Sequence, residues 1–259
     1  MLRSLFALTL LFLQAAPADA QSLKILTTGA FKQVVLEFIP RFEATTGVKV
    51  VLQNDTAGAL VKRISAGESF DIVFLTPAGL STLSGLGKVD PASVKSMAKV
   101  AIGIAVKSGA PHPKLDTVEQ FKEAVLGARR VAYIDPASGG SSGIYLDGLF
   151  HRLGIAEEVR AKAILVPGGL VAERVATGEA DLAIHQVSEI LPVAGVSLAG
   201  LLPDAIQNYT TYGYGVSADT RNGPAASSFL AAVTASGADD VVRAKGMLPV
   251  KASTATQPR

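Results

Sequence analysis

The sequence contains no cysteine, so no disulfide, thiolate metal site, cysteine nucleophile or lipidated cysteine can form in this chain. Histidine is scarce as well, because the 259 residues include only His112, His151 and His185. These three lie far apart, without the HxxxH or HExxH spacing of zinc sites. The sequence therefore argues against a metal centre.

Charge and composition narrow the class further. The 24 basic and 22 acidic residues are scattered without a run of one sign, so nothing indicates a nucleic-acid-binding surface. With 49% hydrophobic and 18% charged residues the chain can bury a large core, which excludes a disordered protein. The length fits one large domain or two lobes of roughly 100–150 residues each.

The first twenty residues predict a cleavable secretory signal. Arg3 supplies its positive start, residues 5–13 its apolar stretch, and Ala18-Asp19-Ala20 its small-residue cleavage site. The apolar stretch is shorter than the roughly 20 residues that a membrane-spanning helix needs. Further along, Asp, Lys, Gly or Pro interrupts every apolar run. We therefore expect an exported, soluble chain that begins at Gln21.

Short β-branched runs alternate with helical patterns, which predicts βαβ units and a mainly parallel sheet. The expected strands are residues 23–27, 48–53, 71–75, 100–106, 131–134, 164–166, 182–184 and 212–217. The expected helices are residues 31–46, 59–66, 117–126, 142–153, 170–176 and 225–235. Pro40 lies inside the first helix and should kink it or cost it a hydrogen bond, and Gly47 should end it.

Two segments of the chain echo one another. Residues 63–68 lead into Asp71 and residues 174–179 lead into Asp181, and in both a helix ends at a glycine before an aspartate opens a buried strand. One explanation is that turns between helices and strands often reuse Gly and Asp. The other is a pair of similar α/β lobes whose strand ends face a shared cleft. Under either explanation Asp71 and Asp181 are expected to be structural.

Three glycine-rich segments follow a predicted strand and open a predicted helix: residues 27–31, 135–143 and 166–170. Small residues let backbone N–H groups reach a ligand, and a helix N-terminus favours an anion. An ordinary turn is the alternative for the first segment, and a flexible linker is the alternative for the second. None matches GxxxxGK[ST] or GxGxxG, so the anion is not predicted to be a nucleotide.

A fourth segment, residues 185–189, follows the strand at 182–184 and carries His185, Gln186, Ser188 and Glu189. These polar groups could point into a cleft. A lone histidine at a strand end is, however, more often structural than catalytic. No GxSxG motif supports a serine hydrolase.

These features together resemble the periplasmic substrate-binding proteins of the molybdate-binding type, which have the type II periplasmic-binding fold. The resemblance rests on the signal, the lack of cysteine, the order of the predicted elements, and four motifs. The motifs are TTGAF at 27–31, Phe42-x-x-x-Thr46-Gly47, GESFDIV at 67–73 and DPASGGSSGIY at 135–145. It implies two α/β lobes joined by crossover strands near 100–106 and 209–216, with the ligand clamped between them. The expected division is a signal peptide at 1–20, lobe 1 at 21–102 plus 214–259, and lobe 2 at 103–213.

Carrying the family's ligand residues over position by position argues against molybdate. Where the family has a serine, a serine-rich turn and a tyrosine, this sequence has Ala30, Thr56-Ala57-Gly58 and Gln186. Two hydroxyl donors to an oxyanion are therefore missing. Residues 186–196, read as QVSEILPxxGV, resemble aconitate isomerase and its relatives, which share this fold and act on a tricarboxylic acid. Gln186 suits a carboxylate, because its amide can donate hydrogen bonds.

The resemblance implies a periplasmic solute-binding protein that captures a small anion, an organic carboxylate or a molybdate-like oxyanion, for an ABC-type transporter. Its expected partners are the ligand and the transporter permease, with no nucleic acid, no cofactor and a monomeric state. The candidate ligand-binding residues are Thr28, Gly29, Ala30, Phe31, Thr56, Gly58, Ser141, Ser142, Leu170 and Gln186.

The alternative is a cofactor-free isomerase of an unsaturated tricarboxylic acid, which must move an allylic proton and needs a general base. His185 has an ordinary pKa near neutrality, whereas Glu189 or Asp55 would need a pKa raised by burial. A third alternative, an exported scaffold without a ligand, leaves the three glycine-rich helix starts without a purpose.

Overall fold

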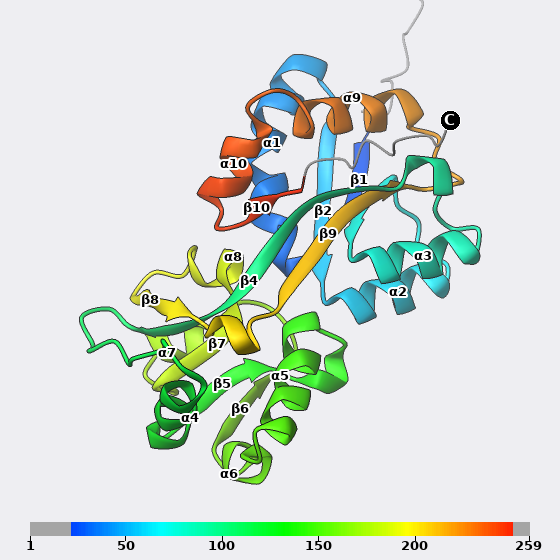
Figure 1. The fold of residues 1–259 in the computed structure, drawn as a ribbon. Helices are drawn as coiled ribbons and strands as arrows, with labels where there is room; N and C mark the ends of the chain where they lie inside the picture. Colours follow the sequence, from blue (N-terminus) through cyan, green and yellow to red (C-terminus); the bar gives the residue numbers. More distant parts are fainter. Residues whose placement is uncertain (1–21, 251–259) are drawn as a thin grey trace, which may run out of the picture.

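The computed structural model describes residues 22–250, so the predicted signal peptide lies outside the described residues. The fold is a mixed α/β structure of two lobes, joined by the long strands β4 (Lys95–Lys107) and β9 (Tyr209–Val216), which run side by side between them (Figure 1). Within the described range, no helix combines the length and apolarity needed to cross a membrane.

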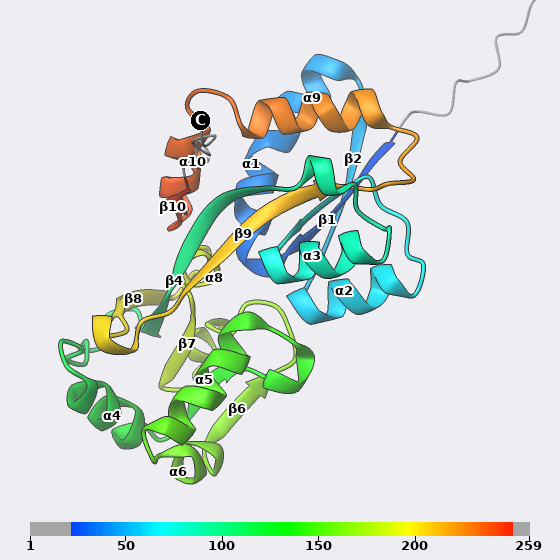
Figure 2. The ribbon, with the colours of Figure 1, turned by 45° about the vertical axis from the view of Figure 1, so that its right-hand side comes forward.

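The first lobe is built around a sheet with the strand order β2-β1-β3-β9-β4. Strands β1 (Ser22–Thr28), β2 (Lys49–Asp55) and β3 (Ile72–Leu75) are parallel, and β10 (Leu248–Pro249) pairs with β4. The helices of this lobe are α1 (Gly29–Thr46), α2 (Ala57–Ser65), α3 (Pro77–Gly85), α9 (Gly223–Val233) and α10 (Ala238–Ala244). The C-terminal segment that follows β9 thus returns to the first lobe (Figure 2).

The second lobe repeats this plan on the continuation of β4, with the strand order β4-β7-β5-β6. Strands β5 (Val131–Ile134), β6 (Ala163–Val166) and β7 (Leu182–Gln186) are parallel, and β8 (Val196–Leu201) pairs with β4. The helices are α4 (Val118–Gly127), α5 (Ser141–Arg152), α6 (Ala156–Arg160), α7 (Glu173–Ala176) and α8 (Val187–Ile190). The predicted boundaries between the two lobes, at 102/103 and 213/214, fall inside β4 and β9. This division of the chain into lobes stays a prediction.

The prediction of a mainly parallel sheet is wrong outside two three-stranded groups. Strands β1–β3 and β5–β7 are parallel within each group, but β4 pairs antiparallel with β7, β8, β9 and β10, and β9 pairs antiparallel with β3. The physical reason is that β4 and β9 carry the chain between the lobes in opposite directions. A crossover strand and its return must therefore lie antiparallel.

The two predicted structural aspartates occupy equivalent places in the two lobes. Asp71 accepts a hydrogen bond from the backbone N–H of Lys24 in β1, at 2.8 Å. Asp181 accepts from the backbone N–H of Arg130, just before β5, at 3.2 Å. Each carboxylate therefore ties the start of one strand to the start of its neighbour, which supports the interpretation of two lobes of similar build.

Apolar side chains on both faces of each sheet form the hydrophobic core of each lobe. In the first lobe Phe31 of α1 lies fully buried and stacks on Phe74 of β3, with ring centroids 5.0 Å apart. Helix α1 begins at Gly29, two residues earlier than predicted, continues through Pro40, and ends before Gly47 at φ 72°. In the second lobe Tyr133 of β5 packs edge-on against Phe150 of α5. These cores fix where each helix begins relative to its strand.

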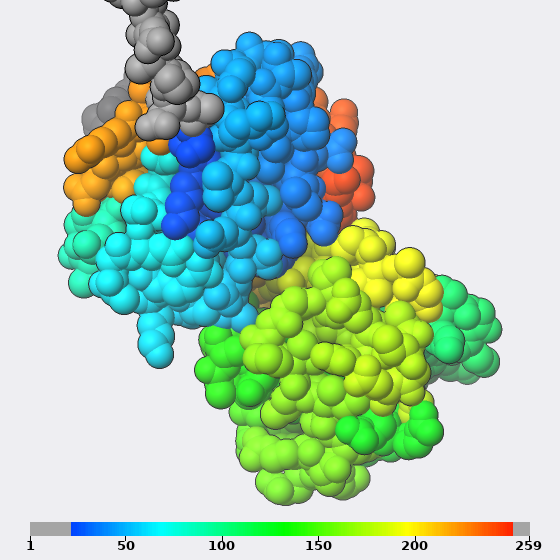
Figure 3. Space-filling view, turned by 180° about the vertical axis from the view of Figure 1, so that it is seen from behind, coloured from blue at the N-terminus to red at the C-terminus, as the bar shows by residue number. Residues whose placement is uncertain are grey.

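The fold brings the carboxyl ends of β1, β2, β5 and β7 to the region between the lobes, where open α/β sheets bind ligands. Helices α1, α2, α5 and α8 begin directly after these strands or a short loop. The space-filling view from behind shows the two lobes meeting at a narrow waist (Figure 3).

Candidate functional site

A small cleft with a cavity volume of about 30 Å³ lies where the lobes meet. A space of this size suits a small guest and not a polymer. Its walls come from both lobes and from β9. The lining residues are Thr28, Gly29, Ala30, Asn54, Asp55, Thr56, Ala57, Ile134, Gly140, Ser141, Ser142, Gly169, His185, Gln186, Glu189 and Tyr212.

Three long helices point their N-termini at this cleft. Helices α1 and α2 begin there from the first lobe and α5 begins there from the second. The first turn of a helix has N–H groups without intrahelical partners, and they carry partial positive charge. Thr56 caps α2 by accepting from Ala59 N, whereas the residues that precede α1 and α5 make no side-chain cap. The starts of α1 and α5 therefore keep N–H groups for a ligand.

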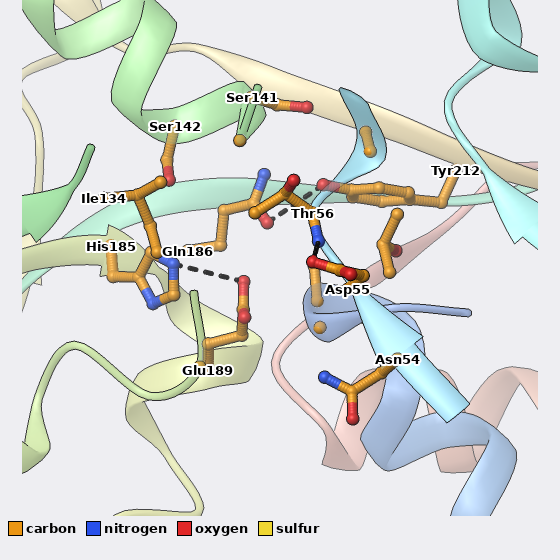
Figure 4. A pocket seen from close by; sticks show the side chains of 16 residues that line it. Asn54, Asp55, Thr56, Ile134, Ser141, Ser142, His185, Gln186, Glu189 and Tyr212 are labelled. Carbon is orange, nitrogen blue, oxygen red and sulfur yellow. Dashed lines mark hydrogen bonds and ion pairs between the residues drawn. The ribbon is translucent and has the colours of Figure 1, made fainter. Parts of the chain in front are cut away.

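A buried histidine and a buried glutamate lie in contact in one wall of the cleft (Figure 4). His185 Nε2 at the end of β7 lies 3.3 Å from Glu189 Oε2 in α8. Burial lowers the pKa of His185 to about 3 and raises the pKa of Glu189 to about 8, against a smaller opposing effect of Lys32. At neutral pH the contact therefore joins a neutral imidazole to a protonated carboxylic acid.

The Glu189 carboxyl group also rests against the first residue of α1. A methyl group on Gly29 would overlap Glu189 Oε1, so only glycine allows this approach. The contact joins the acid of the second lobe to a helix N-terminus of the first. Because that terminus favours negative charge, it assists the ionised form of Glu189 when the proton leaves.

Among the described residues that line the cleft, none is a lysine or an arginine. Asp55 lines its mouth, but it accepts hydrogen bonds from Thr56 N at 2.8 Å and from Arg63 at 3.0 Å. Its charge is thus offset, and Glu189 is protonated at neutral pH. The cleft is therefore neither acidic nor cationic, and it offers an anion neutral donors.

Several buried polar atoms of the cleft and its wall have no hydrogen-bond partner within residues 22–250. They are Thr28 Oγ1, His185 Nδ1, Gln186 Nε2 and Ser188 Oγ. Leaving a buried polar group unpaired costs about 1–3 kcal/mol. Gln186 Oε1 differs, because the Tyr212 hydroxyl donates to it at 3.0 Å. The unpartnered donors of Thr28 and Gln186 are suited to the oxygen atoms of a ligand.

The lobes touch directly at the edge of the cleft through backbone atoms. Gly58 N in α2 donates to Gly139 O in the loop before α5, at 3.0 Å, and Thr56 Oγ1 donates to Ser138 O. A Cβ atom on Gly58 would lie 2.9 Å from the Gly139 Cα. We call this contact of Gly58 with Gly139 the glycine contact. It requires that neither residue carry a side chain.

Most of the residues predicted from the sequence come together here. Those that line the cleft are Thr28, Gly29, Ala30, Thr56, Ser141, Ser142 and Gln186, with the candidate bases His185, Glu189 and Asp55. Phe31 instead points into the core of the first lobe, and Leu170 packs against the core of the second while Gly169 lines the cleft. Gly58 contributes the glycine contact.

Sequence reasoning missed Asn54, Ile134 and Tyr212. It singled out the segments that contain Ala57, Gly140 and Gly169 without naming these three as ligand residues. Tyr212 matters most, because it brings a phenol hydroxyl into the cleft from β9. The sequence placed β9 as a crossover strand, and a crossover passes the space between the lobes. That position was a signal that one of its tyrosines could reach the site.

A family described as bacterial extracellular solute-binding protein matches residues 23–248. The curated aconitate isomerase of a Pseudomonas species is 32% identical over 243 residues, covering 92% of this chain and 91% of that enzyme.

Among solved structures, the periplasmic molybdate-binding protein of Azotobacter vinelandii superposes with a TM-score of 0.71 at 19% identity, over 87% of this chain and 98% of that one. The sulfate-binding protein SubI from Mycobacterium tuberculosis gives a TM-score of 0.70 at 16% identity, over 89% of this chain and 88% of that one. At these identities the likeness is one of fold.

Proposed function

This chain belongs to the family of bacterial extracellular solute-binding proteins, and we propose that it binds a small unsaturated polycarboxylic acid between its lobes and isomerises it. The observation that carries the proposal is the buried pair of His185 and Glu189 in the cleft wall. Capture of an anion needs donors alone. A carboxyl group whose pKa burial raises to about 8 is instead suited to proton transfer near neutral pH.

The proposed reaction is an allylic shift in which no atom is gained or lost. Ionised Glu189 removes a proton from the carbon beside one substrate carboxylate, and the electron pair of that C–H bond forms the new double bond. The old double bond opens, and its far carbon takes a proton back from Glu189. His185 Nε2 lies 3.3 Å from the Glu189 carboxyl group and, as a neutral imidazole, adds no charge beside it.

The substrate carboxylates are proposed to bind to neutral donors. These are the free N–H groups at the starts of α1 and α5, the hydroxyls of Thr28 and Ser142, and the amide of Gln186. Donors preorganised in a buried cleft stabilise the charge that moves onto the carboxylate when the carbon loses its proton. The likeness to aconitate isomerase supports aconitate as the first substrate to test.

The test mixes purified protein with cis- or trans-aconitate and follows both isomers by chromatography. We expect many turnovers per protein molecule, with kcat/KM rising with pH to a plateau above a pH of about 8 as Glu189 ionises. Glu189→Gln should bind aconitate without converting it, whereas Glu119→Gln, on the exposed surface of α4, should remain active. Conversion no faster than in a protein-free control would refute the isomerase proposal.

Solute capture for a membrane transporter is the second candidate, favoured by the family and by the two-lobed fold. In this candidate function the protein is a monomer that closes on a small anion and delivers the anion to the permease of an ABC-type transporter. A saturable thermal shift with aconitate or another small anion, without turnover, would support this function over the first. Binding of the liganded protein to membranes that contain the transporter would complete the case.

We further propose that the protein works in the periplasm, in keeping with a family of extracellular proteins. The predicted signal segment at 1–20 would then be removed on export. Mass spectrometry of protein from a periplasmic extract should find a chain that starts at Gln21. An intact N-terminus in the cytoplasmic fraction would contradict export.

A further inference from the structure

The side-chain amide of Gln186 is held in one orientation by Tyr212. The Tyr212 hydroxyl lies 3.0 Å from Gln186 Oε1, and both side chains are almost completely buried. Burial raises the pKa of Tyr212, so the phenol keeps its proton and remains a donor. The hydroxyl donates to the carbonyl oxygen of the amide, which is the only acceptor that the amide has.

The ring of Tyr212 has little freedom to move. It sits in β9, paired with β4, and packs beside Phe31 with ring centroids 6.5 Å apart. The hydroxyl is therefore fixed by the sheet on one side and by an aromatic side chain on the other. A fixed donor specifies the orientation of the amide that it contacts.

The consequence appears at the other end of the amide. Gln186 Nε2 is buried, has no hydrogen-bond partner within the described residues, and belongs to a side chain that lines the cleft. Figure 4 shows that the hydrogen bond from the Tyr212 hydroxyl ends on the oxygen of the amide and not on this nitrogen. Two N–H donors are thus presented in a cleft whose described lining holds no lysine or arginine.

We propose that Tyr212 is a positioning residue for ligand binding: by engaging Gln186 Oε1 it presents Gln186 Nε2 to a carboxylate of the ligand. The inference rests on the proposed function, because it takes the ligand to be a polycarboxylate. Without the phenol hydroxyl the amide can turn, and its oxygen would then face the carboxylate and repel it. Tyr212 itself need not touch the ligand for this effect.

The test measures the Kd of propane-1,2,3-tricarboxylate, a saturated acid that cannot be isomerised, by titration calorimetry. Tyr212→Phe should raise Kd about tenfold or more, as expected when a hydrogen bond to a charged group is lost. Tyr214→Phe is the matched control, because Tyr214 lies two residues along β9, is also buried, and does not line the cleft. It should leave Kd unchanged.

A double-mutant cycle separates positioning from a merely structural role. Gln186→Met removes the amide at similar size and should weaken binding at least as much as Tyr212→Phe. Adding Tyr212→Phe to Gln186→Met should then cause no further loss, because Tyr212 acts through Gln186. Losses that multiply in the double variant, or wild-type affinity in Tyr212→Phe, would overturn the inference.

The same titrations distinguish this inference from the proposed function. If the wild type binds the saturated acid but does not convert aconitate, the isomerase proposal fails and the cycle still decides the role of Tyr212. If the wild type binds no polycarboxylate, both fail. If it binds and converts while Tyr212→Phe behaves as wild type, the positioning role alone is wrong.

Discussion

Replacing Glu189 by glutamine should stabilise the folded protein at neutral and alkaline pH while it removes the proposed proton-transfer group. Burial raises the pKa of Glu189 from 4.5 to about 8. Between those values the folded state holds a proton that the unfolded chain has already released. Glutamine cannot ionise, and its amide is close in size to the protonated acid.

The magnitude follows from linkage. A raised folded pKa costs no stability below the unfolded pKa, and the cost grows with pH until the folded pKa is passed. At about 1.4 kcal/mol per pKa unit, the cost reaches about 3 kcal/mol at pH 7 and about 5 kcal/mol above pH 8. The lowered pKa of His185 works in the opposite direction, because it removes stability as pH falls below 6.5. Since His185 is present in both proteins, its effect largely cancels in the comparison.

The assay is urea unfolding of wild type and Glu189→Gln at a series of pH values from about 5 to about 9, with linear extrapolation to water. The difference in unfolding free energy should be small at the acidic end and favour the variant increasingly toward the alkaline end. Glu119→Gln controls for the loss of one negative charge. A difference that does not change with pH, or a variant that loses stability at alkaline pH, would show that Glu189 is already ionised in the folded protein.

Three further predictions concern other parts of the molecule. Gly58→Ala should break the glycine contact and raise the Kd for the ligand without lowering Tm, whereas Gly85→Ala, where a methyl group meets open space, should not change binding. Thr28→Ala and Ser142→Ala should each weaken binding by up to about tenfold with the fold intact, and calorimetric affinities equal to wild type in both would contradict the site. Asp71→Ala should lower the unfolding free energy by about 2–3 kcal/mol, because it removes the acceptor of three hydrogen bonds that join the segment at 220–222 and β1 to the start of β3; urea unfolding measures this, and a loss near zero would contradict its structural role.

Local sequence patterns sufficed for the glycine-rich starts of α1 and α5 and for most strands and helices, but they missed β8, β10, α3, α6, α8 and α10. The features that were predicted depend on residues that are neighbours in the sequence. The structural roles of Asp71 and Asp181 could be predicted for the same reason, because each stands just before a strand. The antiparallel pairing of β4 and β9 was missed because it depends on how distant segments meet. A propensity pattern carries no information about the direction of a partner strand.

The candidate site divides in the same way. His185 and Glu189 could be chosen because they are ionisable residues at the end of a predicted strand. Their shifted pKa values, however, come from burial, which depends on how distant segments pack. Tyr212 reaches the cleft through the register of β9 against β4, a long-range property. Phe31 was predicted to bind ligand because it adjoins a glycine turn, but its direction was decided by the stacking partner Phe74.

The bond from Gly58 to Gly139 joins main chain to main chain, so this lobe contact involves no side-chain charge at either end. Added salt and mild changes in acidity should therefore leave its strength nearly untouched, unlike a latch made of ion pairs. If closure of the lobes depends on pH, this dependence would then originate inside the cleft, at the Glu189 carboxyl group that contacts the start of α1.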